Sequence, residues 1–137
     1  MSESATSSVT ISEGVLRACE GGTITLAKPG TDYALELVVG EAPSARLGEK
    51  IRGEIRVNAA RMDVIETGGK YIEPVAGPPR RVAGRIVEID SRVNLVVVDA
   101  GPFNVVCTPH ELQKATRFQV DQMVTMGVKP GATFKSI

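Results

Sequence analysis

Residues 82–98 of this chain read VAGRIVEIDSRVNLVVV. The stretch contains two apolar segments, residues 82–90 and residues 93–98, separated by the polar turn Ser91-Arg92. Branched aliphatic residues bounded by turn residues are typical of β-strands. The second segment is apolar almost throughout, which favours a strand buried on both faces. We expect a pair of strands here, with Val93–Val98 also packing against the other half of the chain or another subunit.

The rest of the second half predicts three more strands and one short helix. Thr108 as N-cap, Pro109 at the first helical position and Glu111 predict a helix that runs through Leu112 and Ala115. The predicted strands are residues 103–107, 122–128 and 133–137, the last two separated by the turn at residues 129–131. Three strands, a short helix and two strands are the order of a five-stranded Greek-key barrel of the oligonucleotide/oligosaccharide-binding (OB) type.

The first half repeats this apolar pattern about 70 positions earlier. Residues 14–17 fall on residues 84–87, and residues 33–37 fall on residues 103–107. With one further residue of offset, Ile55 meets Met126. Self-similarity at a fixed spacing indicates a duplicated unit. We therefore predict an all-β protein of two tandem five-stranded Greek-key OB-like barrels, with one short helix each, arising from an internal repeat.

The repeat also sets the expected domain boundaries. Residues 1–11 are polar and read as a disordered tail, and residues 67–80, rich in Gly and Pro, read as a linker. Residues 12–66 and residues 81–137 are the two predicted barrels. Within the linker, Tyr71-Ile72 is expected to pair as an extra edge strand.

The first predicted barrel contains further strands within residues 50–65 and a less regular segment at residues 41–47. Alternating polar and apolar residues over Lys50–Asn58 predict one strand, and Met62–Ile65 is expected to form another that closes the unit. Glu41–Leu47 occupies the position of the helix but contains Pro43. A helix and a plain turn both stay open there.

Composition narrows the classes of partner. The chain has 137 residues, 42% of them hydrophobic and 23% charged, with a formal net charge of +0. It therefore has no general attraction to nucleic acid or to an anionic membrane. No apolar run approaches the ~18 residues of a transmembrane helix. Two widely separated cysteines, Cys19 and Cys107, indicate a cytoplasmic protein with free thiols.

The second half resembles the tandem molybdate-binding (Mop/TOBE-like) barrels, an OB-type family. The resemblance rests on the Gly-containing strand Val82–Ile89, the valine-rich strand Val93–Asp99 and the closing segment Gln122–Lys129, where a lysine follows an apolar strand. It implies a small oxyanion of the molybdate type as ligand, no other cofactor, and a homo-oligomer that holds ligands between barrels.

The resemblance assigns ligand binding to Lys129 and Thr133. A lysine at a turn is also a plausible anion ligand on physical grounds, because backbone N–H groups at turns form small anion-binding nests. Pro130-Gly131 departs from the small and hydroxyl residues that follow this lysine in the family. In the first repeat Asn58 stands at the matching position, without a lysine.

Cys107, His110 and Glu111 bring a thiol, an imidazole and a carboxylate close together in sequence. A zinc site needs three or four ligands, mostly nitrogen or sulfur. The chain has one histidine and one further cysteine, so no metal site is predicted. A Cys–His nucleophile pair would need an orienting partner and a cleft. The residues supply no such set, and we expect no catalytic residues and no enzymatic activity.

Two pairs of arginines suggest nucleic-acid binding as an alternative. Arg52 and Arg56 share one face of a predicted strand, and Arg80 and Arg85 lie close together at the start of the second barrel. Either pair could follow a phosphate backbone. Single-strand binding also requires exposed aromatic residues for base stacking, and aromatic residues make up only 4% of the chain. Nucleic acid is therefore the weaker choice of partner.

Three non-enzymatic hypotheses follow. The first is a small-oxyanion-binding module that uses Lys129 and Thr133. The second is a structural or adaptor subunit that binds other protein subunits through its edge strands. The third is weak single-stranded nucleic-acid binding through Arg52, Arg56, Arg80 and Arg85.

Overall fold

The computed structural model of this protein describes residues 8–137, which form a mostly β fold with one mixed sheet of eleven strands. The strands are β1 (Ser12–Glu20), β2 (Thr23–Ala27), β3 (Ala34–Val38), β4 (Lys50–Ile65), β5 (Tyr71–Glu73), β6 (Ala76–Gly77), β7 (Arg81–Asp90), β8 (Leu95–Asp99), β9 (Asn104–Thr108), β10 (Met123–Val128) and β11 (Thr133–Ser136). Two short 3-10 turns, η1 (Ser8–Thr10) and η2 (Ala115–Arg117), complete the described residues. The predicted all-β composition is confirmed.

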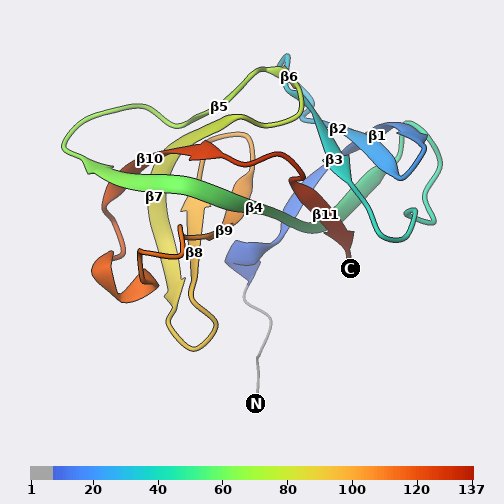
Figure 1. Ribbon diagram of the computed structural model, residues 1–137. Coiled ribbons are helices and arrows are strands. Elements are labelled where there is room, and N and C mark those ends of the chain that lie inside the picture. The colour runs from blue at the N-terminus through green and yellow to red at the C-terminus, as the bar shows by residue number, and fades with distance from the viewer. Residues whose placement is uncertain (1–7) are drawn as a thin grey trace.

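The long strand β4 connects two groups of strands and runs across the molecule between them (Figure 1). Its first part pairs with β1 on one edge and with β11 on the other. Its later part pairs with β9 and β10. The pairings close into two circuits, β1-β2-β3-β11-β4 and β7-β8-β9-β4-β10, and β4 belongs to both.

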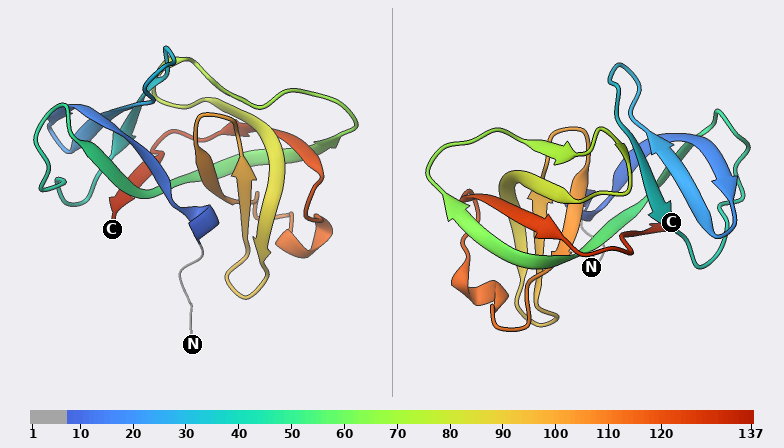
Figure 2. Two further views of the ribbon diagram at one scale, coloured as in Figure 1. Left: turned by 180° about the vertical axis from the view of Figure 1, so that it is seen from behind. Right: turned by 45° about the horizontal axis from the view of Figure 1, so that its top comes forward.

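Each circuit takes one strand segment from the other half of the chain. β11, at the end of the second half, pairs with β3 and β4 in the first circuit. The part of β4 from Ala59 to Ile65 pairs with β10 in the second circuit. The segment from β10 to β11 therefore runs alongside β4 in the opposite direction, and both pass from one group of strands to the other (Figure 2). The pairing crosses the expected division between residues 12–66 and residues 81–137.

The prediction of separate strands over Lys50–Asn58 and Met62–Ile65 is wrong, because both segments belong to the uninterrupted strand β4. Opposite Gly127 and Val128 the register shifts by one residue, which leaves Ala60 as the extra residue of a β-bulge. A bulge bends and twists a strand without ending it. This lets a single strand leave one circuit and enter the other.

The prediction of one short helix in each half is also wrong, because residues 8–137 contain no α-helix. Thr108 ends β9 and does not cap a helix. The Leu112 N–H donates to His110 Nδ1 at 3.1 Å, and the Gln113 side chain bonds to the backbone of Met62. These side-chain bonds compete with helix formation, and only η2 follows. Glu41–Leu47 is a loop.

The predicted linker is partly ordered by pairing. The expected edge strand at Tyr71-Ile72 is confirmed as β5, which pairs with β7. The Ile72 N–H donates to the Tyr33 hydroxyl at 3.3 Å and so ties β5 to the first half of the chain. Of the predicted tail, Ser8–Thr10 form η1 against β9 and β4, and residues 1–7 lie outside the described residues.

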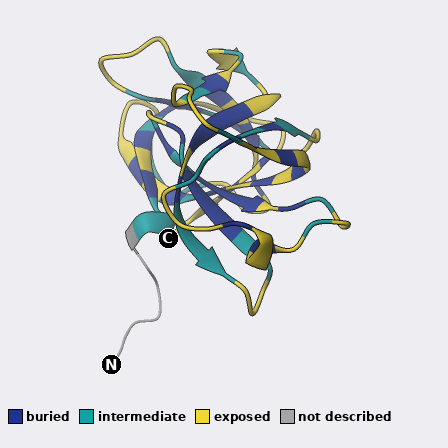
Figure 3. Cartoon of the chain, turned by 90° about the vertical axis from the view of Figure 1, so that its left-hand side faces the viewer, coloured by how far each residue is buried: buried dark blue, intermediate teal, exposed yellow. Residues whose placement is uncertain are grey.

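The core is mainly aliphatic and continues through both circuits. Inward residues such as Ile24, Ile55 and Ile86 are fully buried. Figure 3 shows buried residues along the strands and exposed residues in the connecting loops. In β8, Val96 and Val98 face the core, while Val97, on the opposite face, is only 2% exposed. The predicted burial on both faces is confirmed for Val96–Val98, whereas Val93, placed in the same predicted strand, lies in the preceding turn and is exposed.

A buried serine joins the two circuits beside β4. Ser12, at the start of β1, is 4% exposed. Its Oγ donates to the Asn104 carbonyl at 2.7 Å and accepts from the Asn104 N–H at 3.0 Å. The Asn104 side chain donates in turn to the Val9 carbonyl at 2.8 Å. Ser12 and Asn104 therefore tie β1 and η1 to β9, where the edge of β4 passes from one circuit to the other.

Candidate functional site: a basic groove beside β11

A groove of about 1420 Å³ lies between the loop after β3 and the strands β4 and β11. The loop contributes Gly40–Ala45, and β11 with its following residue contributes Thr133–Ile137. In Figure 1 the connection from β3 to β4 passes beside β11 near the C-terminus. The remaining lining residues come from the first part of β4. We call this feature the β11 groove.

Strand alternation explains which side chains face outward at the β11 groove. Ile51 and Ile55 of β4 are buried, so Arg52, Glu54 and Arg56 lie on the outer face. In β11, Phe134 is buried, and Thr133 and Lys135 face outward. The ladder sets Thr133 opposite Arg56 and Lys135 opposite Glu54. Outward residues on paired strands are neighbours, so basic side chains and a hydroxyl gather on one surface.

The groove is locally basic although the chain is neutral overall. Its lining has four basic and two acidic side chains, a net side-chain charge of +2. The basic residues are Lys50, Arg52, Arg56 and Lys135, and the acidic ones are Glu41 and Glu54.

Among the described residues, Arg56 is the one groove cation that an ion pair neutralises. Arg56 bonds to Glu54 Oε1 from Nε at 2.9 Å and from its terminal nitrogen at 2.8 Å. Within residues 8–137, Lys50, Arg52 and Lys135 make no ion pair, although Glu13 of β1 stands opposite Arg52. Uncompensated cations around a concave surface attract an anionic ligand.

The structure brings some of the predicted site residues together and separates others. Thr133 joins Arg52 and Arg56 in the groove, whereas Lys129 does not line it. The Lys129 N–H donates to the Asn58 carbonyl at 2.9 Å, so it is already engaged. Asn58 and Lys129, which occupy matching positions in the repeat, thus meet where the chain crosses between circuits.

Arg80 and Arg85 lie on the other circuit, outside the groove. The Arg80 carbonyl accepts from the Val128 N–H at 2.8 Å, and Arg85 stands opposite Met123 and Asp99 in the β7 ladders. Lys135 also lines the groove but was not among the predicted site residues. Its position two residues after Thr133 on a predicted strand was the available signal, because such residues share a face.

The cysteine and histidine of the second half do not form a reactive pair. Cys107 is fully buried in β9, and burial raises the pKa of its thiol far above the ordinary range. His110 accepts the Leu112 N–H at Nδ1. Across the described residues, His, Cys, Asp and Glu side chains form no group of three or more that could hold a metal ion.

Aromatic side chains do not line an open stacking surface in the described part of the chain. Phe103, Phe118 and Phe134 are at most 7% exposed. Tyr33 and Tyr71 are half-buried, and neither lines the groove. Base stacking on exposed rings is a main source of affinity for single strands. The groove therefore offers charge without stacking.

Compared with known protein families, curated proteins and solved structures, the chain shows no match to any of them. Between residues 8 and 137 no helix is both long and apolar enough to cross a membrane.

Proposed function

We propose that this protein is a non-enzymatic binding module for a small oxyanion of the molybdate type, held in the β11 groove. One observation carries the proposal. Thr133, which the sequence resemblance assigns to anion binding, lies beside Arg56 and in the same groove as Arg52 and Lys135. Guanidinium, ammonium and hydroxyl groups donate hydrogen bonds to the oxygens of a tetrahedral oxyanion. The bonds from the charged groups are strong because they are charge-assisted.

The strand order supports the further proposal that each circuit is an OB-type barrel. In the first circuit β3 and β11 are parallel and the other neighbours are antiparallel. With β11 counted as its fifth strand, the order is first, second, third, fifth, fourth. The second circuit has the same order when the later part of β4 counts as the fifth strand. A five-stranded Greek-key barrel has this arrangement.

Nucleic-acid binding has less support. Of the four arginines proposed for it, Arg52 and Arg56 line the groove and Arg80 and Arg85 do not. An adaptor role is favoured by one specific observation: within residues 8–137 the outer edge of β11 pairs with another strand only at Thr133.

The test is a thermal melt of the protein across a sodium molybdate titration, with sulfate and phosphate as controls. Ligand at about 100 times its dissociation constant adds roughly 2.7 kcal/mol to the free energy of unfolding. We expect a saturable rise in Tm with molybdate that disappears in the double variant Arg52→Ala/Lys135→Ala. The matched control Arg80→Ala/Arg85→Ala removes two arginines outside the groove and should keep the shift.

A flat titration would exclude the oxyanion proposal. A shift that survives Arg52→Ala/Lys135→Ala but is lost in Lys129→Ala would place the anion at the turn after β10, away from the β11 groove. These outcomes separate the two candidate positions for one ligand.

A further inference from the structure

The outer edge of β11 lacks a strand partner along most of its length. The Ile137 N–H donates to the Arg52 carbonyl at 3.1 Å, which fixes the alternation of the β4–β11 ladder. By that alternation the backbone groups of Phe134 and Ser136 point away from β4. β3 pairs with β11 only at Val38–Thr133. Within residues 8–137, the Phe134 carbonyl and both backbone groups of Ser136 therefore face the groove without a partner.

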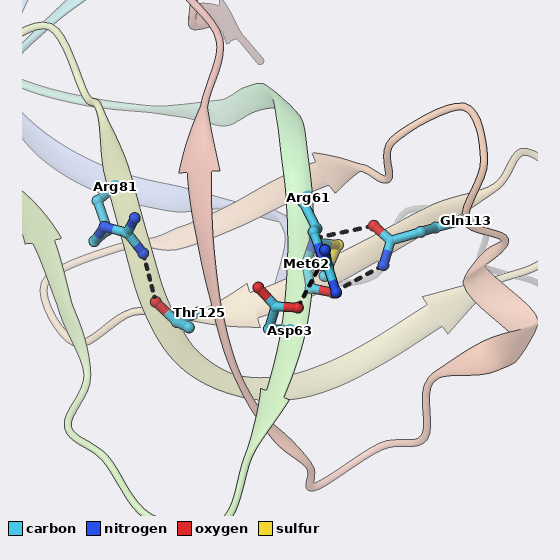
Figure 4. A network of polar contacts seen from close by, with 6 residues as sticks. All are labelled: Arg61, Met62, Asp63, Arg81, Gln113 and Thr125. Atoms are coloured by element: carbon cyan, nitrogen blue, oxygen red, sulfur yellow. Dashed lines mark hydrogen bonds and ion pairs between the residues drawn. The ribbon is translucent and has the colours of Figure 1, made fainter.

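The corresponding edge in the second circuit is closed by a side chain. Met62 stands opposite Met126, as Phe134 stands opposite Ile55, and the repeat aligns Met126 with Ile55. Met62 and Phe134 are thus equivalent, and both are buried. The Met62 N–H donates to Gln113 Oε1 at 2.9 Å, and Gln113 Nε2 donates to the Met62 carbonyl at 2.8 Å. Figure 4 shows the Gln113 amide reaching β4 in this way.

A primary amide that both accepts from and donates to one residue imitates the backbone of a neighbouring strand. The Gln113 amide in the second circuit therefore indicates that an amide group fits the corresponding outer edge of β11. An offset of 70 residues, which places Ala45 on Ala115, places Pro43 on Gln113. Proline has neither an amide side chain nor an N–H. Pro43 lines the β11 groove, so the position that Gln113 fills in the second circuit is left open in the first.

We propose that an extended acidic peptide segment of a partner protein docks in the β11 groove as an added strand. Its backbone amides would bond to the Phe134 carbonyl and to Ser136, as the Gln113 amide bonds to Met62. Strand addition of this kind takes affinity from main-chain hydrogen bonds and specificity from the alternating side chains. The outward cations Lys50, Arg52 and Lys135 select acidic side chains on the peptide. Peptide docking goes beyond oxyanion binding, because it needs the backbone edge of β11 as well as the charges of the groove.

The experiment uses the full chain and a fluorescein-labelled peptide, Val-Glu-Val-Glu-Val-Glu, blocked at both ends. We expect saturable fluorescence anisotropy that weakens with added salt. Ser136→Pro removes the outward N–H while leaving the bonds of β11 to β4 in place, and proline is tolerated at strand edges. This variant should weaken binding by about tenfold, the worth of one or two hydrogen bonds. Ser136→Ala, which keeps the N–H, is its matched control.

Pro43→Gln provides a second variant in case Ser136→Pro does not fold, which a thermal melt would reveal. The new glutamine can close the β11 edge from within the chain, so it should compete with the peptide and raise its dissociation constant. A peptide with lysine in place of glutamate should bind far more weakly. No saturable binding of the acidic peptide up to about 1 mM, an affinity of only ~4 kcal/mol, overturns the proposal. Undiminished binding to both Ser136→Pro and Pro43→Gln also overturns it.

The molybdate titration keeps this proposal distinct from the oxyanion proposal. Ser136→Pro should change a molybdate-induced rise in Tm no more than Ser136→Ala does, because both variants lose the same hydroxyl and both keep the basic side chains of the groove. Arg52→Ala/Lys135→Ala should weaken the binding of both the peptide and molybdate. Peptide binding without a molybdate response would retain the docking site and reject the oxyanion as the natural ligand.

Discussion

Removing the Ser12 hydroxyl tests whether the contact between β1 and β9 stabilises the whole fold. In Ser12→Ala the Asn104 N–H loses its 3.0 Å acceptor, and the Asn104 carbonyl loses a donor at 2.7 Å. The site is 4% exposed, so water cannot easily replace the hydroxyl. Leaving a buried backbone group without a partner costs about 1–3 kcal/mol, which is the expected loss in the free energy of unfolding.

That loss converts into a measurable change in melting temperature. Unfolding entropy is about 2.1 cal/mol/K per residue. For a chain of 137 residues this amounts to roughly 0.3 kcal/mol/K. A loss of about 1–3 kcal/mol therefore lowers Tm by about 3–10 °C.

The assay is a circular dichroism melt, repeated as urea unfolding to check that the slope with denaturant is unchanged. Ser44→Ala, an exposed loop serine without a hydrogen bond in the described residues, is the control and should shift Tm by less than about 2 °C. Ser12→Thr keeps the hydroxyl and should retain more stability than Ser12→Ala. A Tm for Ser12→Ala equal to that of Ser44→Ala would refute the reasoning, since the Ser12 hydroxyl would then add no stability to the contact between β1 and β9.

Three further predictions concern β7, the linker and the shared strand. Gly84→Ala should destabilise by about 1–3 kcal/mol, because a Cβ there would collide with the Asp99 carbonyl, whereas Gly127→Ala, with only Ala60 nearby, should melt close to the wild type. Partial burial raises the pKa of Asp99, but bonds from Lys70 and the Gly101 N–H lower it below its ordinary value overall. The stability that this carboxylate adds is therefore present above about pH 4 and lost as pH falls through the lowered pKa, so Asp99→Asn should lower Tm at pH 7 and converge with the wild type in acid. Residues 1–80 and residues 81–137, produced separately, should each remain unfolded, and co-expression should yield a folded complex with a cooperative melt, because each circuit needs a strand segment from both halves.

Local patterns predicted most of the strands, because a strand that is buried on one or both faces leaves its periodicity in the sequence. The valines of β8 and the edge strand at Tyr71 are examples. The failed helix shows where local reasoning stops. The cap residues at Thr108 and Glu111 are genuine helix signals, but the Gln113 side chain bonds to Met62, 51 residues away, and the segment forms a turn in place of a helix. Bonds between such distant residues leave no mark in a local pattern.

The exchange of strands could not be predicted for a related reason. Residues Thr133–Ser136 alternate in the same way whether they pair within their own half or with β4 of the other half. Alternation correctly placed Arg52 and Arg56 on one face, and both line the groove. Their proximity to Thr133 depends on the pairing of β11 with β4 in the first circuit. The alternation of residues within a strand does not specify which strand it pairs with.

That crossing also links ligand binding to the integrity of the fold. The β11 groove takes Arg52 from the first half of the chain and Lys135 from the second, on strands that the β4–β11 ladder joins. A ligand that contacts both sides stabilises the pairing of the halves by the free energy with which it prefers the folded state. Conversely, a substitution that loosens β11 weakens the groove without touching a charged residue. Stability and binding should therefore change together in variants of this ladder, whereas variants of the distant β7–β8 ladder should lower stability and leave the intrinsic affinity of the groove unchanged.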